Sequence, residues 1–143
     1  MAESADTDHV FRARLPATPP SIAVFRDQLR SWLEQRQVLA SQIFDIVLAC
    51  SESLTLVIEH GGKQVALVVD VEAAIGDGEV VLTTRDYGLW DEAHAVDREE
   101  PLGLALMRAF MDSVELERHA DGQRITLRKR VTLVTDQPHA VLS

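Results

Sequence analysis

Disulfides within the chain are excluded by composition, because the 143 residues include one cysteine, Cys50. Cys50 lies within an apolar pattern of helical period, which favours a buried, inert thiol over a nucleophile. A chain without disulfides fits a reducing compartment, so the expected localisation is the cytoplasm.

Apolar runs of membrane-spanning length are also missing. No stretch of about 18 uncharged apolar residues occurs, so we expect no membrane helix and no membrane partner. Residues 1–8 are acidic and polar and lack the basic start and apolar stretch of a secretory signal. We expect them to form a flexible tail.

Basic residues are outnumbered. The sequence has 14 lysines and arginines against 23 aspartates and glutamates, which gives a formal net charge of −9. A field of this sign repels phosphate backbones, so direct binding to nucleic acid is not expected. A protein partner with a basic face would instead be attracted to this chain.

The apolar residues that are present make up 46% of the chain, enough for the core of one domain. Their spacing alternates in some segments and follows a helical period in others. Five strands are expected, at residues 9–15, 64–72, 79–86, 114–117 and 124–130. Three helices are expected, at residues 21–37, 41–60 and 101–110, and Pro19-Pro20 could set the start of the first slightly earlier. The first helix has an apolar stripe formed by Ile22, Phe25, Leu29, Trp32 and Leu33, and the second has one formed by Ile43, Val47, Cys50, Leu54, Val57 and Ile58. Residues 75–78 are predicted to form a turn and residues 87–100 a mobile loop.

Consecutive strands that are joined by short turns must run antiparallel. The elements therefore predict an α+β fold, a two-layer sandwich in which three helices cover one face of a mostly antiparallel mixed sheet of about five strands. We expect one domain over residues 9–131, with residues 132–143 as a C-terminal tail.

Three motifs follow one another along the chain. In the second helix, Glu52, Leu56 and His60 are spaced by four residues, which places them on one helix face. Asp86 and Gly88 end a strand. Asp86 continues the inward-facing row of that strand, where a carboxylate is costly without a partner. The third motif, Leu102-Gly103-Leu104, begins the third helix, and Gly122 lies in the last turn of the chain.

In this order the motifs resemble the GHKL ATPase superfamily, and within it the bacterial anti-sigma-factor serine kinases. The resemblance covers about residues 9–131. It implies a histidine kinase-like ATPase fold that takes ATP and Mg²⁺, with Glu52 as general base and an asparagine at position 56 as the metal ligand. It also implies that Asp86 accepts a hydrogen bond from the adenine amino group. The other nucleotide-binding positions that it implies are Gly88, Leu102, Gly103 and Gly122.

Several positions depart from the family pattern. Leu56 replaces the asparagine and offers no oxygen to a hard cation, so no metal site is predicted. Trp90 and Pro101 replace glycines, and Pro101 has no N–H to donate to phosphate. Glu99 places a negative charge where a triphosphate would lie. Gln123 also replaces a threonine of the family pattern. Together these departures imply that the general base is vestigial and that binding of ATP and Mg²⁺ is weakened or lost.

The retained residues also have purely structural interpretations. Glu52 can also be a solvated helix acid, and Asp86 can also be the cap of a turn. Gly88 and Gly103 can serve turn and packing geometry, and His60 suits a helix end.

Two functions stay open on the sequence. The first is a regulator of bacterial transcription that binds a sigma factor, an anti-sigma-factor antagonist or both, as a possible homodimer. The alternative is an active, ATP-dependent serine kinase that phosphorylates such an antagonist. Whether the chain is an enzyme is therefore left undecided by the sequence.

Overall fold

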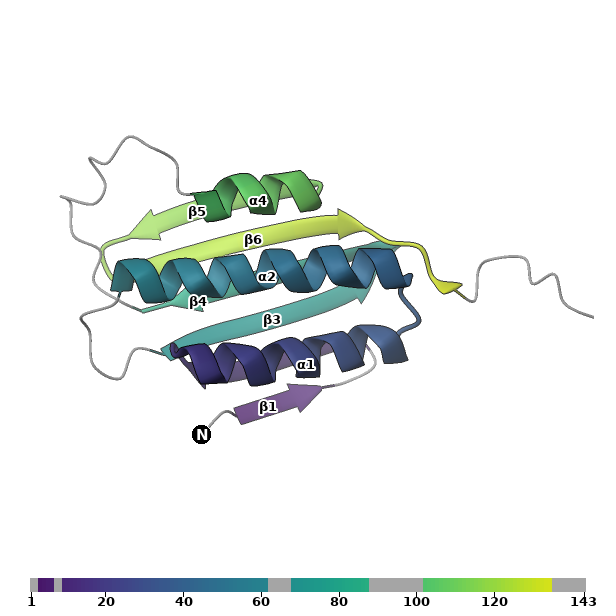
Figure 1. The fold of residues 1–143 in the computed structure, drawn as a ribbon, viewed down its shortest axis with the longest axis horizontal. Helices are drawn as coiled ribbons and strands as arrows, with labels where there is room; N and C mark the ends of the chain where they lie inside the picture. The colour runs from purple at the N-terminus through teal and green to yellow at the C-terminus, as the bar shows by residue number, and fades with distance from the viewer. Residues whose placement is uncertain (1–2, 7–8, 62–67, 88–101, 135–143) are drawn as a thin grey trace, which may run out of the picture.

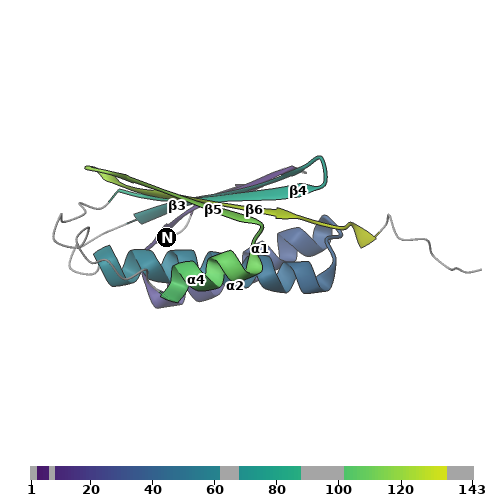
Figure 2. The same ribbon diagram turned by 90° about the horizontal axis from the view of Figure 1, so that it is seen from above.

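The computed structural model describes residues 3–6, 9–61, 68–87 and 102–134. In these residues a six-stranded sheet of order β1-β2-β3-β4-β6-β5 is covered on one face by α1, α2 and α4, and its other face is bare (Figures 1 and 2). The strands are β1 (Glu3–Asp6), β2 (Val10–Pro16), β3 (Val68–Gly76), β4 (Glu79–Asp86), β5 (Ser113–His119) and β6 (Gly122–Arg130). The helices are α1 (Pro19–Gln35), α2 (Ala40–Gly61) and α4 (Leu102–Phe110).

This arrangement confirms the predicted α+β sandwich, and every strand pair among the described residues is antiparallel. One expectation at the N-terminus is wrong. Glu3–Asp6 were predicted to belong to a flexible tail but form β1, which pairs with β2 from Glu3↔Arg14 to Asp6↔Phe11. The outer edge of β2 would otherwise leave backbone N–H and C=O groups unpaired. A short polar segment can pair with them through its own backbone, without an apolar pattern in its side chains.

The predicted C-terminal tail also begins too early. Leu133 forms a bridge with Val38 in the turn between α1 and α2. The Leu39 N–H donates to the Thr132 carbonyl at 2.9 Å, and the Thr132 N–H donates to the Gln42 side chain at 2.6 Å. Residues 132–134 are thus held against the domain by backbone hydrogen bonds, which side-chain patterning does not reveal.

Several element boundaries differ from the prediction by a few residues. Helix α1 begins at Pro19, the earlier of the two expected starts, because the Thr18 hydroxyl caps the helix by accepting from the Ser21 N–H and proline suits a first turn. Strand β3 was predicted over residues 64–72 and lies at Val68–Gly76, while residues 62–67 lie outside the described residues.

The predicted turn at residues 75–78 is confirmed and is tighter than expected. Asp77 and Gly78 have φ values of 54° and 76° between β3 and β4. Two successive positive φ angles belong to the type I′ hairpin turn, whose twist matches that of the flanking strands.

The core lies between the sheet and the helices. All five residues of the predicted stripe on α1 are buried: Ile22, Phe25, Leu29, Trp32 and Leu33. The ring of Phe11, on β2, stacks on Phe25 and Trp32, with ring centroids 5.7 and 6.0 Å away. Aromatic contacts of this kind fix the position of α1 over the edge of the sheet.

Helix α2 lies between α1 and α4 (Figure 1) and is buried over more than its predicted stripe. By length and apolar composition its residues 40–59 are suitable to cross a membrane, but 56% of that window is buried inside the protein. A helix packed on three sides by its own domain is apolar for that reason. Its composition is therefore weak grounds for a membrane span.

Candidate nucleotide site

A buried hydrogen bond attaches α2 to β4. Ser53 and Thr84 are 0% and 2% exposed, and their hydroxyl oxygens lie 2.6 Å apart. Side chains alternate along a strand, so Asp86, two residues after Thr84, points to the same helix-covered side. The Ser53–Thr84 bond therefore holds the middle of α2 over the end of β4 that carries Asp86.

Asp86 is 1% exposed, as its place in the inward row predicted. The residue has other contacts, yet its Oδ2 atom is buried and accepts no hydrogen bond from the described residues. A buried carboxylate oxygen is costly unless a donor reaches it. The resemblance assigns this carboxylate to the adenine amino group; its buried place at the end of β4 is compatible with that role, which stays a prediction.

Gly122 lies directly beside Asp86. Its φ is 146°, and a Cβ atom placed on it would lie 2.1 Å from the backbone oxygen of Asp86. No side chain fits in that space, so β6 can begin this close to the end of β4 only with glycine. The structure thus brings together Asp86 and Gly122, two of the predicted nucleotide-binding residues.

Glu52 and Gly103 form a second pair, where α2 packs against α4. Glu52 is half-buried, and a Cβ atom on Gly103 would lie 3.4 Å from its Oε2 atom and 3.7 Å from its backbone oxygen. These are ordinary van der Waals distances, so position 103 would also accept an alanine, and the packing does not by itself require glycine. Leu102, the preceding residue, is 75% exposed and points away from the core.

Leu56 occupies the position of the expected metal ligand, one turn beyond Glu52 on α2. Its side chain is 2% exposed and belongs to the hydrophobic core. Mg²⁺ binds oxygen ligands, and an aliphatic side chain supplies none. This position therefore does not fit the metal.

Gln123 is a feature of the site that sequence reasoning treated only as a departure from the family pattern. The side chain is 1% exposed, and its Oε1 atom accepts from the Arg118 Nε at 3.1 Å. Its Nε2 atom is buried without a hydrogen-bond partner in the described part of the chain. The alternation of β6 gave a signal, because Gln123 shares the inward row with the buried Ile125 and Leu127.

Other predicted positions lie outside the described residues. They are Gly88, Trp90, Glu99 and Pro101, all in the segment 88–101. His60 falls within α2, but its side chain is also outside the described part of the chain. The roles of these residues stay predictions.

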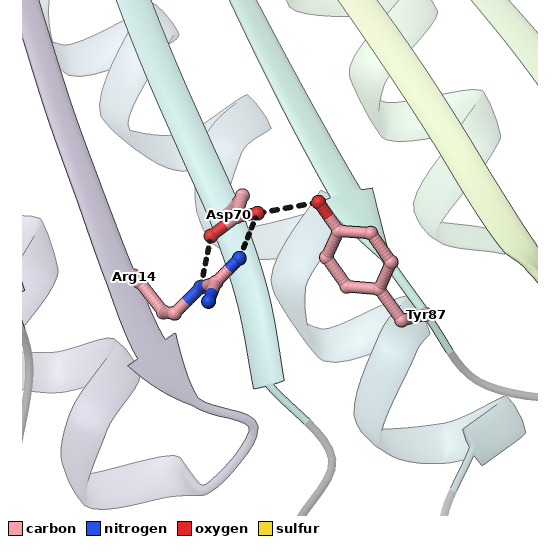
Figure 3. Close-up of polar contacts among 3 residues, drawn as sticks. All are labelled: Arg14, Asp70 and Tyr87. Atoms are coloured by element: carbon pink, nitrogen blue, oxygen red, sulfur yellow. Dashed lines mark hydrogen bonds and ion pairs between the residues drawn. The ribbon is translucent and has the colours of Figure 1, made fainter.

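Tyr87 follows Asp86 and lies on the bare side of the sheet, where it joins a polar network (Figure 3). Its hydroxyl donates to Asp70 at 2.5 Å, and the Arg14 guanidinium donates to both carboxylate oxygens of Asp70 at 2.7 and 2.9 Å. The hydrogen bond from Arg14 lowers the pKa of Asp70, and the bond from Tyr87 adds to this effect. The hydrogen bond to Asp70 in turn raises the pKa of Tyr87.

Asp70 is expected to make a small, pH-dependent contribution to stability. Because the folded-state pKa is lowered, this contribution is present above the unfolded pKa of about 4 and is lost as the pH falls through the folded value. Urea unfolding of Asp70→Asn should therefore show a deficit against the wild type at pH 7 that shrinks toward pH 3. The deficit should be small, since solvent screens the pair. A deficit that is constant with pH would contradict this assignment.

The chain is similar to known proteins. A family model described as the histidine kinase-like ATPase domain matches residues 15–129. An anti-sigma F factor of Clostridium acetobutylicum is 29% identical over 129 residues, covering 81% of this chain and 85% of that protein. Serine-protein kinase RsbW of Bacillus pumilus is 26% identical, with 87% of each chain covered.

A solved structure is also similar. It contains the RsbU and RsbW domains of Rv1364c from Mycobacterium tuberculosis, with a TM-score of 0.67 and 28% identity. The match covers 87% of this chain and 32% of that one, so the present chain spans about a third of its length.

Proposed function

The chain belongs to the histidine kinase-like ATPase family, and on that premise we propose that it is an anti-sigma-factor-like regulator whose binding of Mg-ATP is weakened or lost. It acts by contact with a sigma factor, with an antagonist protein, or with both. The names of its relatives, anti-sigma F factor and a serine-protein kinase, support this class of function.

The observation that carries the proposal is the burial of Leu56 at the position of the metal ligand. Magnesium bridges the phosphates of bound ATP in this family, and it neutralises charge that develops on transfer. Without an oxygen at position 56, Mg²⁺ would lack one of its protein ligands. The net charge of −9 would in addition repel the triphosphate. The base-binding end, with Asp86 and Gly122, is consistent with a site inherited from a nucleotide-binding ancestor.

The acidic chain suits a partner with a basic face, whose association would weaken as salt is raised. Purification of binding proteins from the native cell at low salt is the direct way to identify this partner. The resemblance further implies a homodimer, and sedimentation of the purified chain at micromolar concentration tests that state.

A second candidate function is the active serine kinase. The presence of Glu52 favours it, because the resemblance implies that this residue is the general base and its half-buried carboxylate lies beside Gly103 of α4. The two candidates differ in one measurable property, the affinity for Mg-ATP.

Isothermal titration of the full chain with Mg-ATP should give no saturable binding at micromolar concentration. The same titration with manganese replacing magnesium should also fail, since both ions require oxygen ligands. ADP without metal serves as the control, because it tests the base-binding end with fewer phosphate charges. Saturable micromolar binding of Mg-ATP, with transfer of labelled phosphate to a purified antagonist, would instead establish the kinase.

A further inference from the structure

The helices cover one face of the sheet and leave the other bare (Figure 2). The residues of the bare face line a hollow of about 980 Å³. We call it the bare-face hollow; it extends across β2, β3, β4, β6 and β5. Five arginines and four acidic residues line it. The whole chain has a net charge of −9, so this lining is a locally basic region in an acidic protein.

The charges in the bare-face hollow follow the strand register. One row across the sheet reads Arg14, Asp70, Arg85, Arg124 and Glu117, each directly opposite the next on the neighbouring strand. Opposite charges face each other at every step except one. Arg85 and Arg124 are like charges in direct opposition, an arrangement that destabilises a sheet unless something offsets it.

Arg85 is held in place and retains hydrogen-bonding capacity. Its side chain is 17% exposed, and its guanidinium lies 4.8 Å from the centroid of the Tyr87 ring. Its Nη2 atom is 3.6 Å from Asp121, while its Nη1 atom is buried and has no hydrogen-bond partner among the described residues. A buried N–H group in this state is costly and favours a ligand that can accept from it.

Arg124 is exposed beside it. In the part of the chain that the structure describes, its side chain has no hydrogen bond or ion pair, whereas Arg12 and Arg14 on the same face are paired with Glu72 and Asp70 at 2.8 and 2.7 Å. The guanidinium of Arg124 is therefore available to a ligand that enters the bare-face hollow. Planar guanidinium groups match the oxygens of phosphate through paired hydrogen bonds.

We propose that Arg85 and Arg124 bind the phosphate group of a small molecule, either free phosphate or a phosphate monoester, in the bare-face hollow. Two guanidiniums balance the charge of one phosphate group, which is about −1.5 to −2 for a monoester near pH 7. Four acidic side chains around the hollow repel a polyphosphate or a nucleic-acid backbone. The site is separate from the nucleotide site, because Arg85 and Tyr87 alternate with the inward-facing Asp86 on one strand.

The single tyrosine of the sequence supplies a local probe. The full chain is labelled with fluorotyrosine, and the ¹⁹F signal of Tyr87 is followed while phosphate or O-phosphoserine is added at pH 7.5 and constant ionic strength. We expect a saturable shift of the signal with either ligand. The ligand that binds more tightly identifies the source of the phosphate group, and acetate at equal concentration should bind far more weakly.

Arg124→Gln should weaken phosphate binding by about tenfold or more, because it removes one of the two guanidiniums. Arg12→Gln is the matched control, since Arg12 lines the same hollow and is exposed but pairs with Glu72. It should leave the affinity within about twofold. Far-UV circular dichroism verifies that both variants remain folded.

Three results would overturn the proposal. The first is the lack of a saturable Tyr87 shift with either phosphate ligand. The second is equal weakening by Arg124→Gln and Arg12→Gln, which indicates unspecific screening. The third is acetate binding as tight as phosphate, which rejects the tetrahedral dianion as the ligand.

Discussion

Gly122→Ala should destabilise the fold by roughly 3–5 kcal/mol, the largest effect that we expect from a single added methyl group. The added Cβ would lie 2.1 Å from the Asp86 backbone oxygen, 2.9 Å from its carbonyl carbon and 3.0 Å from the Tyr87 Cα. All three are backbone atoms of the β4 end, so no side-chain rotation relieves the clash. The φ of 146° adds backbone strain for alanine.

Urea unfolding followed by tryptophan fluorescence measures this loss. Gly76→Ala is the matched control, since a Cβ on Gly76 meets no atom within 4 Å and its backbone is not in the left-handed region. That variant should change the free energy of unfolding by less than about 0.5 kcal/mol. A loss below about 1 kcal/mol for Gly122→Ala would show that the two strand ends do not approach as described.

The fold was largely predictable because its apolar periods are strong. The stripe on α1 and the inward rows of β3 and β4 each bury the residues that their spacing indicated. The limits of β3 were not predictable in the same way. Its alternation starts before the strand and continues through the buried Ala73, so the pattern gave the correct face but not the correct ends.

Short segments held by backbone bonds were missed for a different reason. β1 has four residues, and the bridge between Val38 and Leu133 involves single residues. Such pairings depend on which backbone groups another part of the chain leaves open. That information is contained in the assembled sheet and not in the local sequence.

The candidate site was predictable in part. The alternation of residues 79–86 alone places Asp86 in the interior, and the observed burial of this side chain agrees with that inference. The opposition of Arg85 and Arg124 is not predictable in this way, because it depends on the register between β4 and β6. To predict this register, one must know how the chain between β4 and β6 is folded. Residues 87–100 are part of that connection, and their sequence has no periodic apolar pattern.

Leu56→Asn is expected to lower the free energy of unfolding by about 3–4 kcal/mol and to leave the affinity for Mg-ATP weaker than micromolar. The side chain is 2% exposed within the hydrophobic core, so the substitution removes apolar volume and buries an amide. The departures at Trp90, Glu99 and Pro101 lie outside the described residues. The family resemblance implies that they lie at the phosphate end, where they would still oppose a triphosphate.

Leu56→Met is the control, because it keeps the volume and apolar character of the position and should cost less than about 1.5 kcal/mol. Chemical unfolding gives the stabilities, and isothermal titration with Mg-ATP gives the affinities of both variants and the wild type. If Leu56→Asn alone produced micromolar binding of Mg-ATP, position 56 would be the only obstacle and the rest of the site would still be competent. If it bound no better than Leu56→Met, loss of nucleotide binding would involve several positions, as expected of a chain that regulates by protein contact.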